Sequence, residues 1–160
     1  MRIMFVCHGN ICRSPMAECI LRSLVKEKGL EGSIAVCSSA TSTEEIWGGR
    51  GNPIYPPAKA VLRAHGIAVP DREAVQLKKS DYEKYDLFLC MDQNNIRNTL
   101  RIFGSDPRSK VKKLMAYTEC PRDVADPWYT GDFEITYRDI LEGCTALLQE
   151  ISSCEKDREF

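Results

Sequence analysis

The sequence has no long apolar run, no cluster of positive charge and few histidines, and each absence excludes a class of protein. Its longest apolar stretches, residues 3–7 and 87–91, are far too short to cross a bilayer, and the first of them leaves no room for a signal peptide. Lys and Arg number 22 against 23 Asp and Glu, which gives a net charge of −1 and no electrostatic surface for nucleic acid. We therefore expect a cytoplasmic protein with no nucleic-acid or membrane partner.

Metal and disulfide sites are not expected either. The two histidines, His8 and His65, are isolated, and no two cysteines have C-x-x-C spacing. Eight cysteines would suggest a disulfide framework in a small secreted protein, but a chain of 160 residues is long enough to form its own core. We expect reduced thiols, no metal and no cofactor, with six cysteines used for packing: Cys19, Cys37, Cys90, Cys120, Cys144 and Cys154.

Short apolar segments alternate with amphipathic ones, which predicts a parallel sheet with helices on both faces in a single domain of residues 1–160. Buried strands are expected at residues 2–6, 33–37, 85–91 and 111–115. Helices are expected from Pro15, with Ser14 as N-cap, to a stop at Gly29, and at residues 58–65 and 94–101. A closing helix is expected to bury one face, formed by Ile140, Cys144, Leu147, Leu148 and Ile151, and residues 155–160 are expected to fray.

Ligands of such folds bind beyond the carboxyl ends of the strands. The loop that begins at Cys7 leaves the first strand at that end, and the loop after Met115 leaves the fourth strand there. We therefore expect these two loops to meet over one site.

The first loop, residues 7–14, reads C-H-G-N-I-C-R-S and fits the pattern C-x5-R-S/T. Five intervening residues allow the backbone to curl into a bowl whose N–H groups converge, together with the positive end of the following helix, on a bound phosphate. Gly9 and Asn10 suit positions of positive φ, and Arg13 returns to the rim, where its planar guanidinium can bind two phosphoryl oxygens. Besides Cys7 and Arg13, the expected phosphate-binding residues are His8, Gly9, Asn10, Ile11, Cys12 and Ser14.

Cys7 lies at the base of this bowl. The converging N–H groups, the helix terminus, Arg13 and the Ser14 hydroxyl all favour its thiolate. A thiolate beneath a bound phosphate is a nucleophile in line with the phosphorus. A buried structural cysteine is the alternative, but the strand before Cys7 and the Ser-Pro pair after Arg13 favour the nucleophile.

Two segments carry a resemblance to a known family. V-C-H-G-N-I-C-R-S-P at residues 6–15 resembles the signature of the low molecular weight protein tyrosine phosphatases, and D-P-W-Y at residues 126–129 resembles the segment that carries their general acid. The resemblance implies a flavodoxin-like three-layer sandwich with a four-stranded parallel sheet. It also implies metal-independent hydrolysis of phosphotyrosine through a phosphocysteine intermediate. The substrate would be a phosphotyrosine protein, with a tyrosine kinase as one candidate, and phosphate or vanadate would bind as active-site anions.

Asp126 is the expected general acid on chemical grounds as well. Loss of a phenolate is slow unless an acid protonates the leaving oxygen, and a carboxyl beside a phosphate and an apolar wall can keep its proton near neutral pH. The same carboxylate can then activate the water that hydrolyses phosphocysteine. Asp-Pro is otherwise a common turn dipeptide, so the catalytic reading depends on Cys7.

Three aromatic residues, Trp47, Trp128 and Tyr129, are expected to wall the cleft; packing under two long loops is the alternative. An aromatic slot above a phosphate bowl favours phosphotyrosine, because phosphoserine is too short to reach the thiolate. Ile11 offers the substrate ring an apolar surface, whereas relatives that act on phosphoarginine carry threonine at the matching position. His8 either touches substrate or faces solvent, and we leave it outside the catalytic set.

The resemblance bears on further residues around the loop. Cys12 resembles the cysteine that in many relatives forms a reversible disulfide with the nucleophile under peroxide; a small apolar filler is the alternative. Ser38 takes the place of the serine that supports the loop asparagine, here Asn10. The family's A-R-Q segment reads Ala-Val-Gln at residues 74–76, so a buried polar contact is expected to be missing there.

Two other functions are open from the sequence. A thiol-dependent arsenate reductase shares the C-x5-R loop but needs a further pair of cysteines flanking the third strand, where only Cys90 lies. A non-catalytic phosphotyrosine-reading module would bind phosphate without turnover, and the joint presence of a thiol, a guanidinium and an acid argues against it. We therefore expect a phosphatase that acts through Cys7, Arg13 and Asp126.

Overall fold

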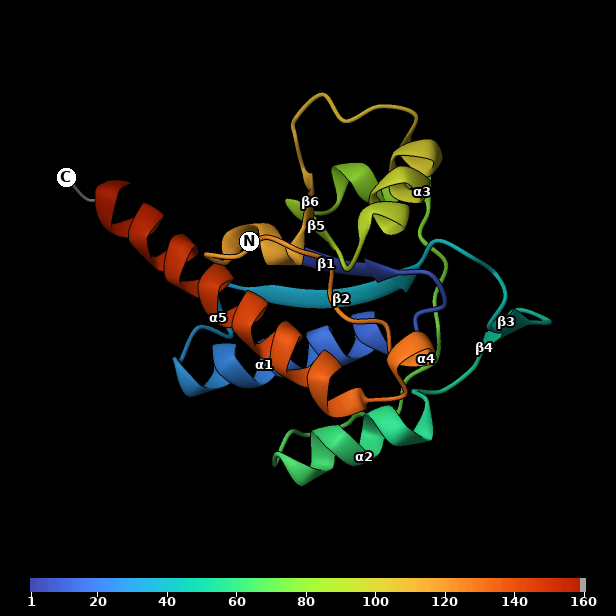
Figure 1. Ribbon diagram of the computed structural model, residues 1–160. Helices are drawn as coiled ribbons and strands as arrows, with labels where there is room; N and C mark the ends of the chain where they lie inside the picture. Colours follow the sequence, from blue (N-terminus) through green and yellow to red (C-terminus); the bar gives the residue numbers. More distant parts are fainter. Residues whose placement is uncertain (159–160) are drawn as a thin grey trace.

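A four-stranded parallel sheet forms the centre of the computed structural model, which describes residues 1–158 (Figure 1). Its strands are β1 (Arg2–Cys7), β2 (Ala35–Ala40), β5 (Leu87–Cys90) and β6 (Val111–Lys113), in the order β2-β1-β5-β6. A separate small hairpin consists of β3 (Ile46–Trp47) and β4 (Arg50–Gly51). The predicted three-layer fold with helices on both faces of a parallel sheet is confirmed.

The helices divide between the two faces of the sheet (Figure 1). One face is covered by α1 (Arg13–Glu27) and α5 (Phe133–Arg158), with α2 (Pro56–Ala64) packed outside them. The other face is covered by α3 (Gln93–Phe103) and the short 3-10 helix η1 (Lys79–Glu83). A second 3-10 helix, η2 (Leu114–Tyr117), follows β6, and the one-turn helix α4 (Pro127–Thr130) lies near the carboxyl ends of the strands, on the same side as the β3–β4 hairpin.

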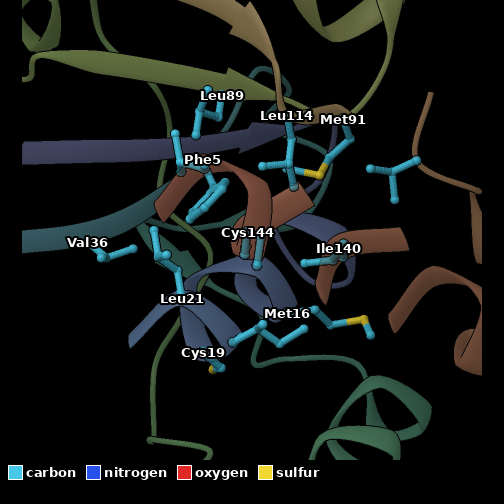
Figure 2. Packing of buried hydrophobic residues seen from close by; sticks show 14 of the residues in the cluster. Phe5, Met16, Cys19, Leu21, Val36, Leu89, Met91, Leu114, Ile140 and Cys144 are labelled. Carbon is cyan, nitrogen blue, oxygen red and sulfur yellow. The ribbon is translucent and has the colours of Figure 1, made fainter. Parts of the chain in front are cut away.

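The larger part of the core lies between the sheet and the helices α1 and α5 (Figure 2). Phe5 and Leu89 extend from neighbouring strands toward Leu21 of α1 and Cys144 of α5, and all four are fully buried. Burial of each large apolar side chain contributes about 1.5–3 kcal/mol to folding. The helix α5 approaches η2 so closely that a Cβ at Gly143 would lie 2.6 Å from Cγ of Leu114. The start of α1, which forms one side of the loop after β1, is anchored in the same core, since Met16 and Ala17 are fully buried.

Several predicted boundaries are wrong. The helix α1 begins at Arg13 rather than Pro15, and Pro15 is tolerated in the first turn because its missing N–H would have no intrahelical acceptor. The strand β2 spans Ala35–Ala40 rather than 33–37, because its pairing with β1 continues until Cys7 lies opposite Ala40. Likewise β5 is shorter than expected, α2 and α3 are longer, and the end of the predicted fourth strand is helical in η2.

The end of α5 also differs from its prediction. Residues 155–158 continue the helix instead of fraying, and its last turn carries Lys156 and Arg158, whose positive charges suit a helix C-terminus. Residues 159–160, the remainder of that prediction, lie outside the described part of the chain. In residues 1–158, none of the helices combines the length and the apolar character that a membrane span requires.

Candidate active site

A pocket of about 430 Å³ opens at the carboxyl ends of β1 and β5. The loop after β1 forms its floor, and Asp126 reaches it from the long connection that follows β6. The two loops that the sequence analysis expected to meet therefore do so. The lining residues are Cys7 to Arg13, Glu44, Glu45, Asp92, Asn94, Asn95, Asn98, Asp126, Trp128 and Tyr129.

Cys7 ends β1 at the base of the loop and is only 4% exposed. The backbone N–H of Asn10 donates a hydrogen bond to Cys7 Sγ at 3.2 Å, and Ser14 Oγ lies 2.9 Å from the same sulfur. A thiolate has no proton to donate, so with Cys7 ionised the Ser14 hydroxyl is the donor. Two donors thus point at the sulfur, as a stabilised thiolate requires.

Asn10 holds the loop in shape from a fully buried position with φ of 59°. Its side-chain Nδ2 donates to Ser14 Oγ at 2.7 Å and to Ser38 Oγ at 2.9 Å, which is the contact with Ser38 that the sequence analysis expected. Its Oδ1 accepts from the Arg72 guanidinium and from the backbone N–H of Val75. These partners fix the orientation of the amide, because exchanging its oxygen and nitrogen would set the NH₂ group against two obligate donors, the Arg72 guanidinium and the Val75 N–H.

Arg72, three residues before Val75, supplies a buried polar contact to the loop from outside residues 74–76, where the sequence analysis expected a contact to be missing. The segment is Ala-Val-Gln at residues 74–76, but Arg72 reaches the loop instead, with Nη1 donating to the Asn10 carbonyl at 2.8 Å. Burial lowers the pKa of the Arg72 guanidinium, and the carboxylate of Glu18 acts in the opposite direction. Sequence reasoning missed Arg72 because nothing in the local pattern identifies its partner, 62 residues away.

Gly9 is needed for space rather than for backbone freedom. Asn10 has positive φ, whereas Gly9 does not, which contradicts the reason given for glycine at that position. A Cβ on Gly9 would lie 3.2 Å from Cγ of Glu45, which packs across the loop. The glycine therefore lets the segment that carries Glu45 approach the phosphate loop.

Arg13 is buried in the pocket, with its side chain 7% exposed, rather than standing free at the rim. Its Nη2 lies 2.8 Å from Asp92 Oδ2 and 3.3 Å from Asp126 Oδ2, and Nη1 donates to the Val124 carbonyl at 3.2 Å. Asp92 was not predicted as a site residue. A signal did exist, since Asp92 directly follows a buried strand and caps α3 through a reciprocal pair of hydrogen bonds with Asn95.

Asp126 caps the N-terminus of α4, where its Oδ1 accepts a hydrogen bond from the Trp128 N–H at 3.0 Å. The preceding backbone is fixed on two sides: the Val124 N–H donates to the Met91 carbonyl at 2.8 Å, and the Ala125 N–H donates to an Asp139 carboxylate oxygen at 3.0 Å. The side chain of Asp126 remains 24% exposed. The carboxyl can thus reach both solvent and a ligand held by Arg13.

Two of the three predicted wall residues line the pocket. Trp128 and Tyr129 are 60% and 90% exposed, and the Trp128 ring lies 4.8 Å from the ring of Tyr55. Trp47, on β3, is 73% exposed and is not among the described residues that line the pocket. The sequence analysis expected Trp47 to wall the cleft, but the structure does not bring it to the pocket.

The remaining loop residues differ in their surroundings. Ile11 and Cys12 are buried in the pocket lining, whereas His8 lies at the exposed rim with Nε2 3.0 Å from Glu44 Oε2. Burial raises the pKa of the Cys12 thiol to about 12, and nearby Cys7 and Asp126 add to the effect. In the described residues, no three His, Cys, Asp or Glu side chains are grouped so as to hold a metal ion.

Comparisons with known proteins agree with this geometry. Residues 2–157 match the family described as low molecular weight phosphotyrosine protein phosphatase. The chain is 40% identical over 160 residues to the low molecular weight protein-tyrosine-phosphatase YfkJ of Bacillus subtilis. The match covers 99% of this chain and 98% of that protein. The crystal structure of YfkJ gives a TM-score of 0.88 at 37% identity, covering 96% of this chain and 95% of that one.

A second group of similar structures bears on the substrate. The arginine phosphatase YwlE, solved as a cysteine-to-serine mutant with a phosphorylated active-site serine, gives a TM-score of 0.80 at 29% identity. The match covers 95% of this chain and 96% of that one. Enzymes of the same architecture are thus described as phosphatases of two different phosphorylated residues.

Proposed function

Because the chain belongs to the low molecular weight phosphotyrosine protein phosphatases, we propose that Cys7, Arg13 and Asp126 are the residues through which it acts. Like its family, the protein is a protein-tyrosine-phosphatase that works through a phosphocysteine intermediate. The observation that carries the assignment is the meeting of three groups in one pocket: a thiol that two donors face, a buried guanidinium and a carboxyl beside it.

In the first step, the loop N–H groups and Arg13 bind the phosphoryl oxygens of the substrate. The Cys7 thiolate attacks phosphorus, so that a sulfur–phosphorus bond forms as the bond between phosphorus and the tyrosyl oxygen breaks. Asp126 donates its proton to that oxygen, and the products of the step are a free tyrosine side chain, phosphocysteine and an Asp126 carboxylate.

In the second step, water attacks the phosphorus of phosphocysteine. Asp126 takes a proton from this water, the sulfur–phosphorus bond breaks and inorganic phosphate leaves. The Cys7 thiolate is regenerated as the leaving group, and the Ser14 hydroxyl at 2.9 Å stabilises its charge. The cycle returns each residue to its starting state.

Arg13 links substrate binding to the charge of Asp126. In the structure its Nη2 is shared between Asp92 and Asp126. A phosphate dianion in the loop competes with both carboxylates for the guanidinium and places negative charge beside Asp126. Binding therefore releases the Asp126 carboxyl from Arg13 and leaves it free to meet the leaving oxygen.

We propose phosphotyrosine rather than phosphoarginine as the substrate, despite the similarity to an arginine phosphatase. Ile11 lines the pocket with an apolar side chain, and Trp128 and Tyr129 add aromatic surface, which suits a phenyl ring. The substrate is a phosphoprotein, of which a tyrosine kinase is one candidate, and phosphate and vanadate are the expected active-site anions. The single-domain boundary at residues 1–160 and the cytoplasmic location stay predictions.

The two other functions considered above have less support. Arsenate reduction needs a relay of further thiols, but Cys90 is fully buried in β5 and burial raises its pKa to about 12, so it is poorly suited to pass on a disulfide. A reading module would need only the phosphate loop, whereas this pocket also holds Asp126 beside Arg13.

The test is to replace the nucleophile and to trap the intermediate. With Cys7→Ser, we expect aryl phosphate turnover to fall at least about 10⁴-fold while vanadate still binds. Rapid quenching of the wild type should give a phosphate adduct on the peptide that contains Cys7. Cys120→Ser, at an exposed cysteine outside the pocket, is the matched control and should retain activity. Normal turnover in Cys7→Ser, or an adduct on another residue, would contradict the assignment.

A further inference from the structure

Two glutamates at the mouth of the pocket take no part in the mechanism above. We propose that Glu44 and Glu45 select phosphotyrosine substrates that carry a Lys or Arg beside the phosphotyrosine. The inference rests on the proposed function, because it concerns the peptide that surrounds the reacting residue. It assigns to the segment before β3 the recognition of a positively charged side chain.

Glu45 is held in place against the phosphate loop. Its Cγ lies 3.2 Å from the position that a Cβ on Gly9 would occupy, so its side chain crosses the loop directly. Its Oε2 accepts a hydrogen bond from Asn52 Nδ2 at 2.7 Å, and its carbonyl accepts from the Asn52 backbone N–H at 2.8 Å. The carboxylate is therefore positioned at the pocket by both backbone and side-chain bonds.

The charge of these glutamates is largely uncompensated by the protein. The pocket's other two carboxylates, Asp92 and Asp126, share the Arg13 guanidinium. Within residues 1–158, Glu45 forms no ion pair, and Glu44 pairs only with His8, at 3.0 Å. The Glu44 side chain is also 69% exposed and free to meet a substrate.

The part of the mouth that α3 contributes carries no such unpaired charge. There α3 contributes the neutral amides of Asn94 and Asn98 to the lining. Arg97 donates to Asn94 at 3.0 Å and Arg101 donates to Asn98 at 3.3 Å. Neither arginine lines the pocket itself. The mouth thus carries carboxylates at Glu44 and Glu45 and neutral amides at Asn94 and Asn98, which gives a substrate cation one favoured place.

A phosphate dianion in the loop makes such a cation favourable. Glu45 lies close enough to the loop to add to the upward shift of the Cys12 pKa, so the same carboxylate repels a bound phosphate. A Lys or Arg of the substrate placed between phosphate and glutamate is attracted by both. Substrates with a neutral or acidic neighbour leave the repulsion in place, and selectivity follows from the difference.

The first experiment compares three phosphotyrosine peptides that differ only in the residues flanking phosphotyrosine, which are Ala, Lys or Glu. At low ionic strength, we expect kcat/KM for the Lys peptide to exceed that for the Ala peptide about fivefold, mostly through KM, and the Glu peptide to be poorer than the Ala peptide. The ratio should fall toward one at high salt, because exposed charges are screened.

The second experiment removes the charges while keeping polar side chains of the same size. In the double variant Glu44→Gln with Glu45→Gln, we expect the Lys-to-Ala ratio to fall to about one. Glu31→Gln is the matched control, since Glu31 is exposed in the turn after α1 and does not line the pocket, and its ratio should stay at the wild-type value. Using a ratio within one enzyme cancels any general effect of the substitution on turnover.

The outcomes separate this inference from the proposed function. An aryl phosphate without flanking residues is the additional substrate: if the wild type fails to hydrolyse it and all three peptides, the proposed function is wrong. If the wild type hydrolyses the peptides with equal kcat/KM, the selectivity is wrong while the phosphatase assignment stands. A Lys preference that persists in the double variant would overturn the roles of Glu44 and Glu45.

Discussion

The two sides of the active-site pocket are built in different ways. On one side, at the floor, the polar residues Asn10, Arg13 and Ser14 of the phosphate loop are buried, and each is hydrogen-bonded. On the other side, Trp128 and Tyr129 of α4 are mostly exposed to solvent. The loop is held by partners from α1, β2 and the segment around Arg72, whereas the aromatic side is fixed mainly through its backbone.

This difference indicates how the work of the site is divided. A buried loop with several independent partners keeps its N–H groups and thiol in one arrangement, which the chemical step requires. Exposed aromatic rings on a fixed backbone can accommodate different peptides around the same phosphotyrosine. Asp126 combines the two properties, since it lies on the exposed side and yet contacts the buried Arg13.

Replacing Asp126 should have the largest effect, because this residue connects the buried phosphate loop with the exposed side of the pocket. With Asp126→Asn, we expect kcat/KM for aryl phosphates with poor leaving groups to fall about 10²–10⁴-fold, because the leaving oxygen loses its proton donor. The ratio kcat/KM reports the steps up to phosphocysteine formation, so the second role of Asp126, in hydrolysis of phosphocysteine, does not enter it. The loss should be much smaller for a nitrophenolate, which leaves without protonation. A series of aryl phosphates measures this dependence, and an equal loss across the series would show that Asp126 positions Arg13 rather than donating a proton.

Replacing Arg72 tests how far the loop depends on its partners. With Arg72→Ala, we expect kcat to fall about tenfold and the free energy of unfolding to drop by about 1–3 kcal/mol, because Asn10 and Ser38 lose buried hydrogen bonds. Arg72→Lys should recover only part of the activity, since an ammonium lacks the two-pronged geometry. Arg50→Ala, at an exposed arginine of the hairpin, is the control. Unchanged turnover in Arg72→Ala would mean that the remaining partners suffice.

The pH dependence of disulfide formation between Cys7 and Cys12 tests the proposed redox role of Cys12. We propose that its thiolate attacks Cys7 after peroxide has converted Cys7 to a sulfenic acid, forming the disulfide and releasing hydroxide. Burial is the largest cause of the raised pKa of Cys12, and it persists when Cys7 is a neutral sulfenic acid. The Cys12 thiolate fraction is therefore small and grows about tenfold for each pH unit between 7 and 9. Quenched alkylation should show disulfide formation accelerating by that factor. A rate independent of pH, or equal recovery with thiol in Cys12→Ser, would remove this role.

The smallest expected effect concerns the exposed aromatic residues. With Trp128→Ala, we expect KM for an aryl phosphate to rise about threefold with little change in kcat, because one face of the substrate ring loses its contact. Trp47→Ala should change KM less, since Trp47 does not line the pocket. Steady-state kinetics of both variants would measure this. Equal effects would show that the β3–β4 hairpin contributes to the aromatic side as the sequence analysis expected.

Elements that depend on local interactions were predictable from the sequence. Cys7 and Arg13 belong to one short loop, and Asp126 follows the last strand, so the rule that parallel strands present their carboxyl ends together predicted that they meet. Arg72 and Asp92 were missed because their partners, Asn10 and Arg13, lie 62 and 79 residues away. Only packing decides which of many arginines and aspartates meet.

Two residues show a subtler limit. Gly9 was correctly assigned to the loop, but the reason given was a positive φ, which Gly9 does not have. The structure shows instead that the glycine leaves room for the Glu45 side chain. Pro15 was correctly placed near a helix start, but α1 begins two residues earlier. Residue preferences are shared by several physical causes, so a pattern can identify the element and still misstate the interaction that requires it.

The position of the catalytic residues along the chain affects how the enzyme is made. Cys7 ends β1, a strand in the interior of the sheet, whereas Asp126 and its support at Asp139 come from the last third of the chain. During translation the nucleophile therefore leaves the ribosome long before its acid, and both strands that flank β1 must emerge before it is fully paired. The pocket can therefore be completed only after Asp126 and the supporting Asp139 have both been synthesised.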